Sequence, residues 1–180
     1  DCLVVLSPDN AERHEDLADL PLRSGKPVYV DKPIAPTRDA AKRMFDKAAA
    51  HGLLFRPHFK THQSAVVGGW FREAGVSEIT VSSVDMAEYF ARNGWTDILI
   101  AFPVNVRQFR VINNLASQIR LGLLVESIES VQLLASGLDH LVDLWIKVDS
   151  GSGRTGLDWN QSAEIARLAD AIDSEEKFRL

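Results

Sequence analysis

Short apolar runs alternate with helix-length segments along the chain, and this alternation is the strongest constraint on what the chain can fold into. Continuous apolar strands separated by helices are typical of a parallel sheet that helices cover. The runs lie at Leu3–Leu6, Val28–Val30, Leu53–Phe55, Ile79–Val81, Ile98–Ala101, Leu121–Val125, Leu144–Val148 and Phe178–Leu180.

The pattern predicts an α/β protein built from parallel (β/α) units of the TIM-barrel type. Eight apolar runs match the strand number of a closed barrel if the first two units replace missing barrel units. An open sheet or a partial barrel is the alternative, because closure depends on strand tilt and stagger. The sequence leaves both arrangements open.

Local signals place three of the helices between these runs. Asn10 is an expected N-cap for a helix over Ala11–Leu20, and Thr37 for a helix over Arg38–His51. A third helix is expected over Gln161–Ile172, with apolar residues at helical spacing on one face: Ile165, Leu168, Ala169 and Ile172.

Composition is that of one structural body with a single core. The chain has 180 residues, of which 46% are hydrophobic, and its net charge of −5 gives no reason to expect a nucleic-acid partner. Cys2 stands alone, which favours a reducing, cytoplasmic compartment. No apolar run approaches the roughly 20 residues that span a bilayer, so no membrane association is expected. No signal peptide is present, but the chain starts at Asp1 without a methionine, so a processed or truncated origin is an open alternative.

Residues 56–62, Arg-Pro-His-Phe-Lys-Thr-His, place Lys60 between two histidines after an apolar run. A lysine at the C-terminal mouth of a strand can be partly desolvated, which favours the neutral amine that attacks a carbonyl to form a Schiff base. The alternative is a lysine that ends a strand in solvent. His58 and His62 are four residues apart, but on a strand entering a loop they do not converge, and no metal site is expected.

Residues 151–156 match the spacing G-x-G-x-x-G of a dinucleotide-binding loop. In such a fold an acidic residue follows about 20 residues later, at the end of the next strand. The chain ends at Leu180 without that residue, and Asp149 and Arg154 fit a tight pyrophosphate turn poorly. The match therefore does not indicate a nucleotide site.

From about His51 to the end, the chain resembles the fold-type III pyridoxal-phosphate enzymes, the alanine racemase-like barrels. It is most similar to the D-threonine aldolase and D-serine dehydratase branch. The resemblance is carried by residues 56–62, by the segments 78–88 and 94–103, and by Lys147 to Gly156. Gln63 departs from the family, which often has a second lysine there, so Lys60 is the one candidate in the motif.

This resemblance implies pyridoxal 5'-phosphate as the cofactor and a small amino acid as substrate. It implies that Lys60 carries the cofactor, that Arg154 reaches its phenolic oxygen, and that His58 orients the pocket. It also implies a divalent metal held in a C-terminal domain and cofactor-phosphate loops on later strands, neither of which occurs in these residues. A homodimer is one possible assembly, and the 180-residue chain itself is expected to be inactive.

Residues 1–52 resemble a different family. The strand-end sequence Asp31-Lys32-Pro33 is similar to the nicotinamide-binding domain of the glucose-fructose oxidoreductase and inositol dehydrogenase family, where this lysine lies near the nicotinamide. The expected organisation is therefore a Rossmann-derived segment over 1–52 and a partial barrel over 53–180. Two alternatives remain: a fragment of an NAD(P)-dependent oxidoreductase, and a recombined or designed α/β chimera without catalytic activity.

Overall fold

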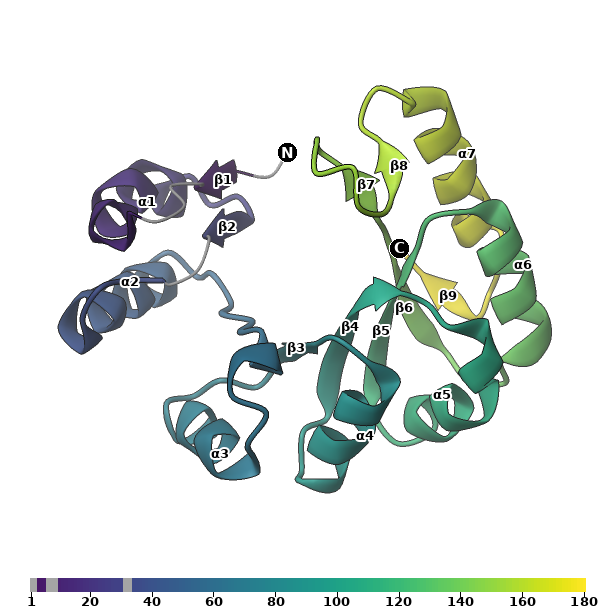
Figure 1. The fold of residues 1–180 in the computed structure, drawn as a ribbon, viewed down its shortest axis with the longest axis horizontal. Helices are drawn as coiled ribbons and strands as arrows, with labels where there is room; N and C mark the ends of the chain where they lie inside the picture. The colour runs from purple at the N-terminus through teal and green to yellow at the C-terminus, as the bar shows by residue number, and fades with distance from the viewer. Residues whose placement is uncertain (1–2, 6–9, 31–33) are drawn as a thin grey trace. The chain divides into compact units, whose positions relative to one another are not determined.

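The computed structural model describes residues 3–5, 10–30 and 34–180. The chain divides into two compact units, Asp1–Phe55 and Arg56–Leu180, whose elements are labelled in Figure 1. Of the helices in the described ranges, none combines the length and the apolar character needed to cross a membrane.

The first unit pairs two short parallel strands with two helices. Its elements in chain order are β1 (Leu3–Val5), η1 (Ala11–Arg13), α1 (His14–Arg23), β2 (Val28–Val30) and α2 (Arg38–Ala50). The two strands align Leu3 with Val28 and Val5 with Val30. Its small core consists of Val5, Ala18, Leu22 and Met44.

Two ion-paired contacts join α1 to α2 on the outside of this core. The Arg43 guanidinium donates to both oxygens of the Glu15 carboxylate at 2.6 and 2.7 Å, and the Lys47 ammonium donates to Asp19. The bidentate geometry favours a defined helix–helix register.

Of the two N-caps predicted in this unit, Thr37 is confirmed, whereas Asn10 stands directly before a helical turn without capping it by its side chain. The Thr37 hydroxyl accepts a hydrogen bond from the Ala40 N–H at 3.2 Å and caps α2. Asn10 makes no side-chain cap bond, and the chain passes through the 3-10 turn η1 before α1 begins at His14. Residues 31–33, which carry the Asp-Lys-Pro sequence, lie outside the described residues.

The second unit is built on a parallel sheet with the strand order β3-β4-β5-β6-β9. The strands are β3 (Ile79–Val81), β4 (Asp97–Pro103), β5 (Arg120–Val125), β6 (Val142–Ile146) and β9 (Phe178–Arg179). A separate parallel pair, β7 (Val148–Asp149) and β8 (Leu157–Asp158), follows β6. The helices are η2 (Phe59–Thr61), α3 (Ala65–Glu73), α4 (Val84–Arg92), η3 (Val106–Gln108), α5 (Phe109–Ala116), α6 (Ile128–Gly137) and α7 (Ser162–Asp173).

The main core lies between the sheet and the helices that connect its parallel strands, and it is formed by alternate residues along the strands. Ile98 and Ile100 of β4 and Leu121 and Leu123 of β5 are almost fully buried. The helices contribute their own buried face, listed here from α4 to α7: Val84, Ala87, Phe90, Ile112, Leu115, Val131, Leu134, Leu168 and Ile172. Figure 1 shows α4, α5, α6 and α7 following one another along one side of the sheet.

The strand prediction failed at residues 53–55. Leu53–Phe55 has no strand structure, and the nearest pairing among the described residues is a single parallel bridge between His58 and Thr80. Pro57 has no N–H to donate to a ladder, although its carbonyl oxygen accepts from the Thr80 N–H at 2.8 Å. Within the described residues the sheet is open, with β3 and β9 at its edges and no closed barrel.

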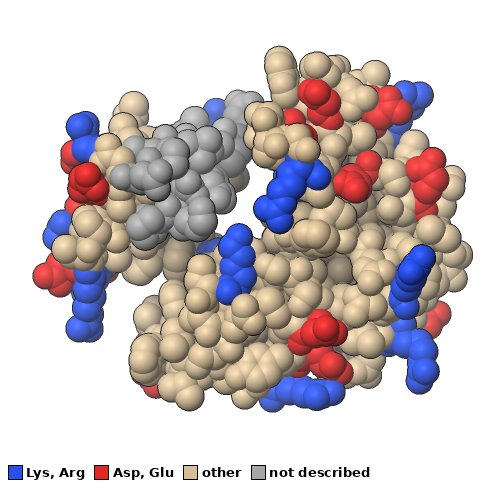
Figure 2. Space-filling view, in the orientation of Figure 1, with Lys and Arg blue, Asp and Glu red and all other residues tan. Residues whose placement is uncertain are grey.

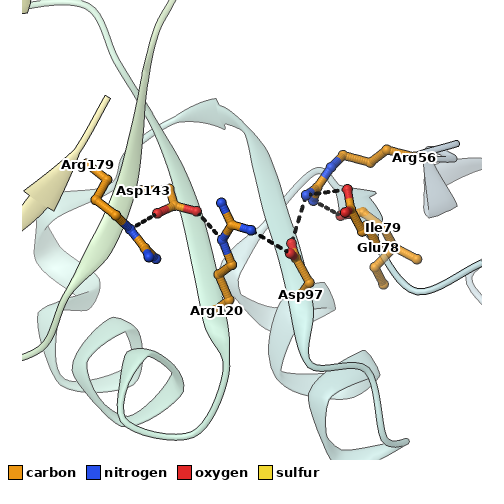
Figure 3. A network of polar contacts seen from close by, with 7 residues as sticks. All are labelled: Arg56, Glu78, Ile79, Asp97, Arg120, Asp143 and Arg179. Atoms are coloured by element: carbon orange, nitrogen blue, oxygen red, sulfur yellow. Dashed lines mark hydrogen bonds and ion pairs between the residues drawn. The ribbon is translucent and has the colours of Figure 1, made fainter. Parts of the chain in front are cut away.

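Alternating basic and acidic side chains cross the sheet at the N-terminal ends of its strands (Figure 3). The Arg56 guanidinium lies 2.8 Å from both Glu78 and Asp97. Arg120 pairs with Asp97 at 3.5 Å and with Asp143 at 2.6 Å, and Arg179 pairs with Asp143 at 2.7 Å. The carboxylates beside Arg120, Asp143 first, raise the pKa of its guanidinium.

An aromatic cluster closes the β3 end of the core. The fully buried Phe59 ring makes edge or tilted contacts with Phe71, Phe90 and Trp95 at centroid distances of 5.3, 4.9 and 5.1 Å. His62 joins this cluster by stacking on Phe71 at 5.5 Å, and its Nε2 is buried without a hydrogen-bond partner among the described residues. Burial lowers the pKa of His62, because the apolar rings disfavour the charged imidazolium.

Asp97→Asn should destabilise the second unit by about 1–2 kcal/mol, because it removes a largely buried carboxylate that pairs with the partly buried Arg56 and with the exposed Arg120. Urea unfolding followed by tryptophan fluorescence measures this, since Trp70, Trp95, Trp145 and Trp159 all lie in the second unit. Glu88→Gln, which breaks an exposed pair with Arg92 on α4, is the control and should cost about 0.3–0.5 kcal/mol. Equal effects of the two substitutions would contradict a structural role for the edge network.

His62→Phe should reduce the loss of stability on acidification. An unfolded histidine takes up a proton near pH 6.5, whereas folded His62 does so only at lower pH, so the free energy of unfolding falls as the pH falls below about 7. The phenylalanine variant lacks this contribution, while His58, whose pKa is also lowered, keeps its own. Unfolding measured between pH 7.5 and 5.5, with exposed His140→Gln as control, decides whether His62 carries part of the pH dependence.

Candidate functional site

A cavity of about 180 Å³ opens at the C-terminal edge of the sheet in the second unit. In (β/α) architectures this edge carries the active site, because the loops that follow all parallel strands meet there. Its lining residues come from the ends of β3, β4 and β6 and from two loops: His58, Lys60, Ser82, Ala101, Phe102, Pro103, Lys147, Ser152, Arg154 and Thr155.

The turn η2 presents His58 and Lys60 to this cavity. The backbone of His58 bridges to Thr80 of the neighbouring segment, and Phe59 points the opposite way into the aromatic cluster, where it is fully buried. The His58 Nδ1 accepts a long hydrogen bond, 3.4 Å, from the Lys60 N–H. The buried phenylalanine therefore anchors the turn, and the two polar side chains on either side of it face the cavity.

His58 is half-buried, and this burial lowers its pKa, with the nearby positive charge of Lys60 acting in the same direction. A neutral imidazole at pH 7 is consistent with an Nδ1 that accepts a hydrogen bond. Lys60 itself is exposed. The partial desolvation predicted for this lysine is therefore not seen, because its side chain is open to solvent.

Arg154 reaches the cavity from the loop of residues 150–156, between β7 and β8. Asp149 organises the start of this loop: its carboxylate accepts from the Gly151, Ser152 and Gly153 N–H groups at 3.0, 2.8 and 2.8 Å. At the end of the loop, the Gly156 N–H donates to Glu126 at 2.7 Å. The loop that carries Arg154 is thus held at both ends.

This geometry argues against a dinucleotide-binding loop. In such a loop, backbone N–H groups are free to bind phosphate oxygens. Here the N–H groups of Gly151, Ser152 and Gly153 already donate to the Asp149 carboxylate. The Asp149 carboxylate therefore occupies the position that a phosphate would take, and it already supplies the negative charge that these N–H groups bind.

The structure brings together the three residues predicted for the site, His58, Lys60 and Arg154, in one cavity. His62 lies instead among the aromatic rings. Within the described residues, no three His, Cys, Asp or Glu side chains gather as a possible metal site.

Sequence reasoning missed several polar lining residues: Ser82, Lys147, Ser152 and Thr155. Their common signal is position, since Ser82 directly follows β3 and Lys147 directly follows β6. Residues just beyond the C-terminal ends of parallel strands are candidates for this edge in any (β/α) protein.

The lining combines three basic side chains, three hydroxyl groups and one imidazole, and it includes no carboxylate. Such a set favours anionic or phenolate oxygens. The concentration of positive charge is local, because Figure 2 shows acidic and basic side chains interspersed elsewhere on the face that it draws.

Two family models match the chain. Residues 41–180 match the alanine racemase N-terminal domain. Residues 1–59 match the oxidoreductase family with an NAD-binding Rossmann fold. The two matches overlap over residues 41–59, around the C-terminal part of α2 and the segment that follows it.

Curated relatives and solved structures agree with the first match. The chain is 36% identical over 121 residues to D-threo-3-hydroxyaspartate dehydratase from Delftia sp. (strain HT23), covering 64% of this chain and 31% of that protein. It is 32% identical over 139 residues to 3-hydroxy-D-aspartate aldolase from Paracoccus denitrificans, covering 72% and 35%. The solved structure of the Delftia enzyme matches with a TM-score of 0.68 at 30% identity, over 77% of this chain and 37% of that one.

The structure of D-threonine aldolase from Filomicrobium marinum matches with a TM-score of 0.69 at 23% identity, over 76% of this chain and 38% of that one, which shows a shared fold. The chain spans about a third of the length of the curated relatives it matches. The resemblance inferred from residues 56–62 and 147–156 is confirmed: the chain belongs to the alanine racemase N-terminal domain family.

Proposed function

We propose that the second unit forms the lysine-bearing side of a pyridoxal-phosphate site in a lyase-type barrel that acts on D-amino acids. The observation that carries this proposal is the single cavity lined by Lys60, His58 and Arg154 at the C-terminal edge of the sheet. In a member of this family, that combination supplies an amine, a neutral imidazole and a fixed positive charge in one place.

The residues present fit pyridoxal phosphate in chemical terms. Lys60 offers a primary amine on an exposed turn, where it is accessible to an aldehyde. Arg154 offers a charge-assisted donor for the phenolic oxygen, and His58 is neutral and packs at the side of the cavity. When bound, the cofactor's pyridine ring withdraws electrons from the substrate Cα.

The remaining lining suits the substrate of such an enzyme. Lys147 and the hydroxyl groups of Ser82, Ser152 and Thr155 can bind the carboxylate of a small amino acid. The volume of about 180 Å³ is below the roughly 300–1,000 Å³ of complete small-molecule pockets. These residues therefore account for one side of the proposed site.

The first unit supports a second candidate function for its own residues. Residues 1–59 match an NAD-binding oxidoreductase family. This match favours an origin of the N-terminal segment, which the sequence resemblance places at residues 1–52, in a nicotinamide-binding domain. We propose a Rossmann-derived segment joined to a partial barrel over 53–180. A chimera without activity is the alternative, and a homodimer and a cytoplasmic location remain predictions.

Borohydride reduction in the presence of pyridoxal phosphate should attach the pyridoxyl group to Lys60, because its exposed amine shares the cavity with Arg154. Peptide mass spectrometry locates the label. Lys60→Arg should reduce labelling at least about tenfold, whereas Lys177→Arg, at a lysine whose ammonium donates to the Leu138 carbonyl, should leave it unchanged. Labelling mainly on Lys147 or Lys32 would show that the assignment of Lys60 is wrong.

A polypeptide of these 180 residues should show no measurable turnover of D-threonine, D-serine or alanine. The described cavity holds only part of the lining that a bound cofactor and substrate need, so productive orientation is not secured. Steady-state assays with added pyridoxal phosphate and divalent metal ions test this. Metal-dependent release of glycine from D-threonine would contradict the expectation.

A further inference from the structure

Asp149 has an unusually complete set of hydrogen bonds for an aspartate next to the candidate site. Its Oδ1 accepts from the Gly151 N–H at 3.0 Å, the Ser152 N–H at 2.8 Å and the Ser152 hydroxyl at 3.1 Å. Its Oδ2 accepts from the Gly153 N–H at 2.8 Å. One side chain thus organises the three residues that directly precede Arg154.

The backbone of this loop depends on that organisation. Gly151 and Gly153 have φ values of +120° and +65°, in the region that disfavours other residues. Both conformations direct N–H groups inward to the carboxylate. Without the acceptor, these exposed N–H groups would donate to water instead, and the flexible glycines would give the loop many alternative conformations.

The far end of the loop is fixed independently. The Leu157 N–H donates to the Lys147 carbonyl at 2.9 Å, and the Trp159 N–H donates to the Asp149 carbonyl at 3.1 Å. A Cβ on Gly156 would lie 2.7 Å from the Lys147 carbonyl oxygen, so only glycine fits there. Arg154 therefore stands between a rigid end at Gly156 and an end where, among the described residues, Asp149 supplies the side-chain hydrogen bonds.

We propose that Asp149 is a positioning residue, which holds residues 150–153 in the one conformation that directs Arg154 into the cavity. The proposal deepens the proposed function and rests on it for the role of Arg154 toward the cofactor. Asp149 acts through Arg154 and touches no reacting atom itself.

The charge of Asp149 supports this role. Hydrogen bonds from the loop, that of the Gly151 N–H first, lower the pKa of the Asp149 carboxyl below its usual range. The carboxylate is therefore ionised at neutral pH, and an ionised acceptor binds N–H groups more strongly than a neutral one does.

Asp149→Asn is the sharpest test, because asparagine keeps one acceptor oxygen and replaces the other with a donor. It cannot serve both the Gly153 N–H and the pair at Gly151 and Ser152. Asp158→Asn is the matched control, since Asp158 pairs with Asp149 across β7 and β8 and loses the same charge. The Asp158 carboxylate accepts from Asn160, outside the loop.

Amide hydrogen exchange and ¹⁵N relaxation measure the result. In Asp149→Asn, the amides that lose their acceptor should exchange roughly ten- to hundredfold faster. These are either the Gly153 amide or the amides of Gly151 and Ser152, depending on which oxygen is replaced. The Arg154 amide should become more mobile. Asp158→Asn should leave these amides within about twofold of the original protein. Should Asp149→Asn not fold, Asp149→Ser, which leaves one neutral acceptor on a shorter side chain, is expected to accelerate exchange of the same amides. Loop amides that behave as in Asp158→Asn would overturn the proposal.

Measurements of cofactor binding distinguish a positioning role of Asp149 from an effect of Asp149 on the stability of the fold. Asp149→Asn should weaken the visible absorbance titration with pyridoxal phosphate several-fold, and this loss should disappear in an Arg154→Leu background, because coupled residues are non-additive. Equal losses in both backgrounds would overturn the role through Arg154. Should no visible band form in any variant, the proposed function fails, and the exchange measurement alone decides whether Asp149 holds the loop.

Discussion

Burial of one face of the five-stranded sheet under α4, α5, α6 and α7 is the interaction on which the rest of the second unit depends. Each buried aliphatic side chain contributes about 1.5–3 kcal/mol, and the helices that supply the cover also return the chain to the same end of the sheet. All strands must then be parallel, and all their C-terminal ends lie at one edge. The cavity exists at that edge because three separate strands deliver Ser82, Pro103 and Lys147 there, and a single bridge to Thr80 of β3 holds His58 beside them.

The two edges of this sheet carry different chemistry. At the N-terminal edge, guanidinium and carboxylate groups alternate and satisfy one another, so the network links the starts of neighbouring strands. At the C-terminal edge, Lys60, Lys147 and Arg154 line a cavity without an acidic partner in its lining. Paired charges stabilise the fold at one end, whereas the positive charges at the other end remain available to an anionic ligand.

The loop of residues 150–156 shows how misleading a short motif is when its context is ignored. Its glycine spacing is that of a phosphate-binding loop, but its N–H groups are used internally by Asp149. The same glycines have a different role here, since they let the backbone fold around the Asp149 carboxylate and direct Arg154 toward the cavity. Family membership over residues 41–180 agrees with this geometry, and the separate match over residues 1–59 explains why the two compact units differ in character.

The sequence by itself determined the parallel α/β architecture and the Thr37 cap, because apolar periodicity and capping are local properties. Its resemblance to a known family indicated the two segments that line the cavity. It failed at Leu53–Phe55, where an apolar run has strand composition but no partner ladder. Only the tertiary structure decided that His62 packs among aromatic rings, and that Ser82 and Lys147 lie with Lys60. These outcomes depend on contacts between residues far apart in the chain, and no local pattern encodes which strand will lie beside which.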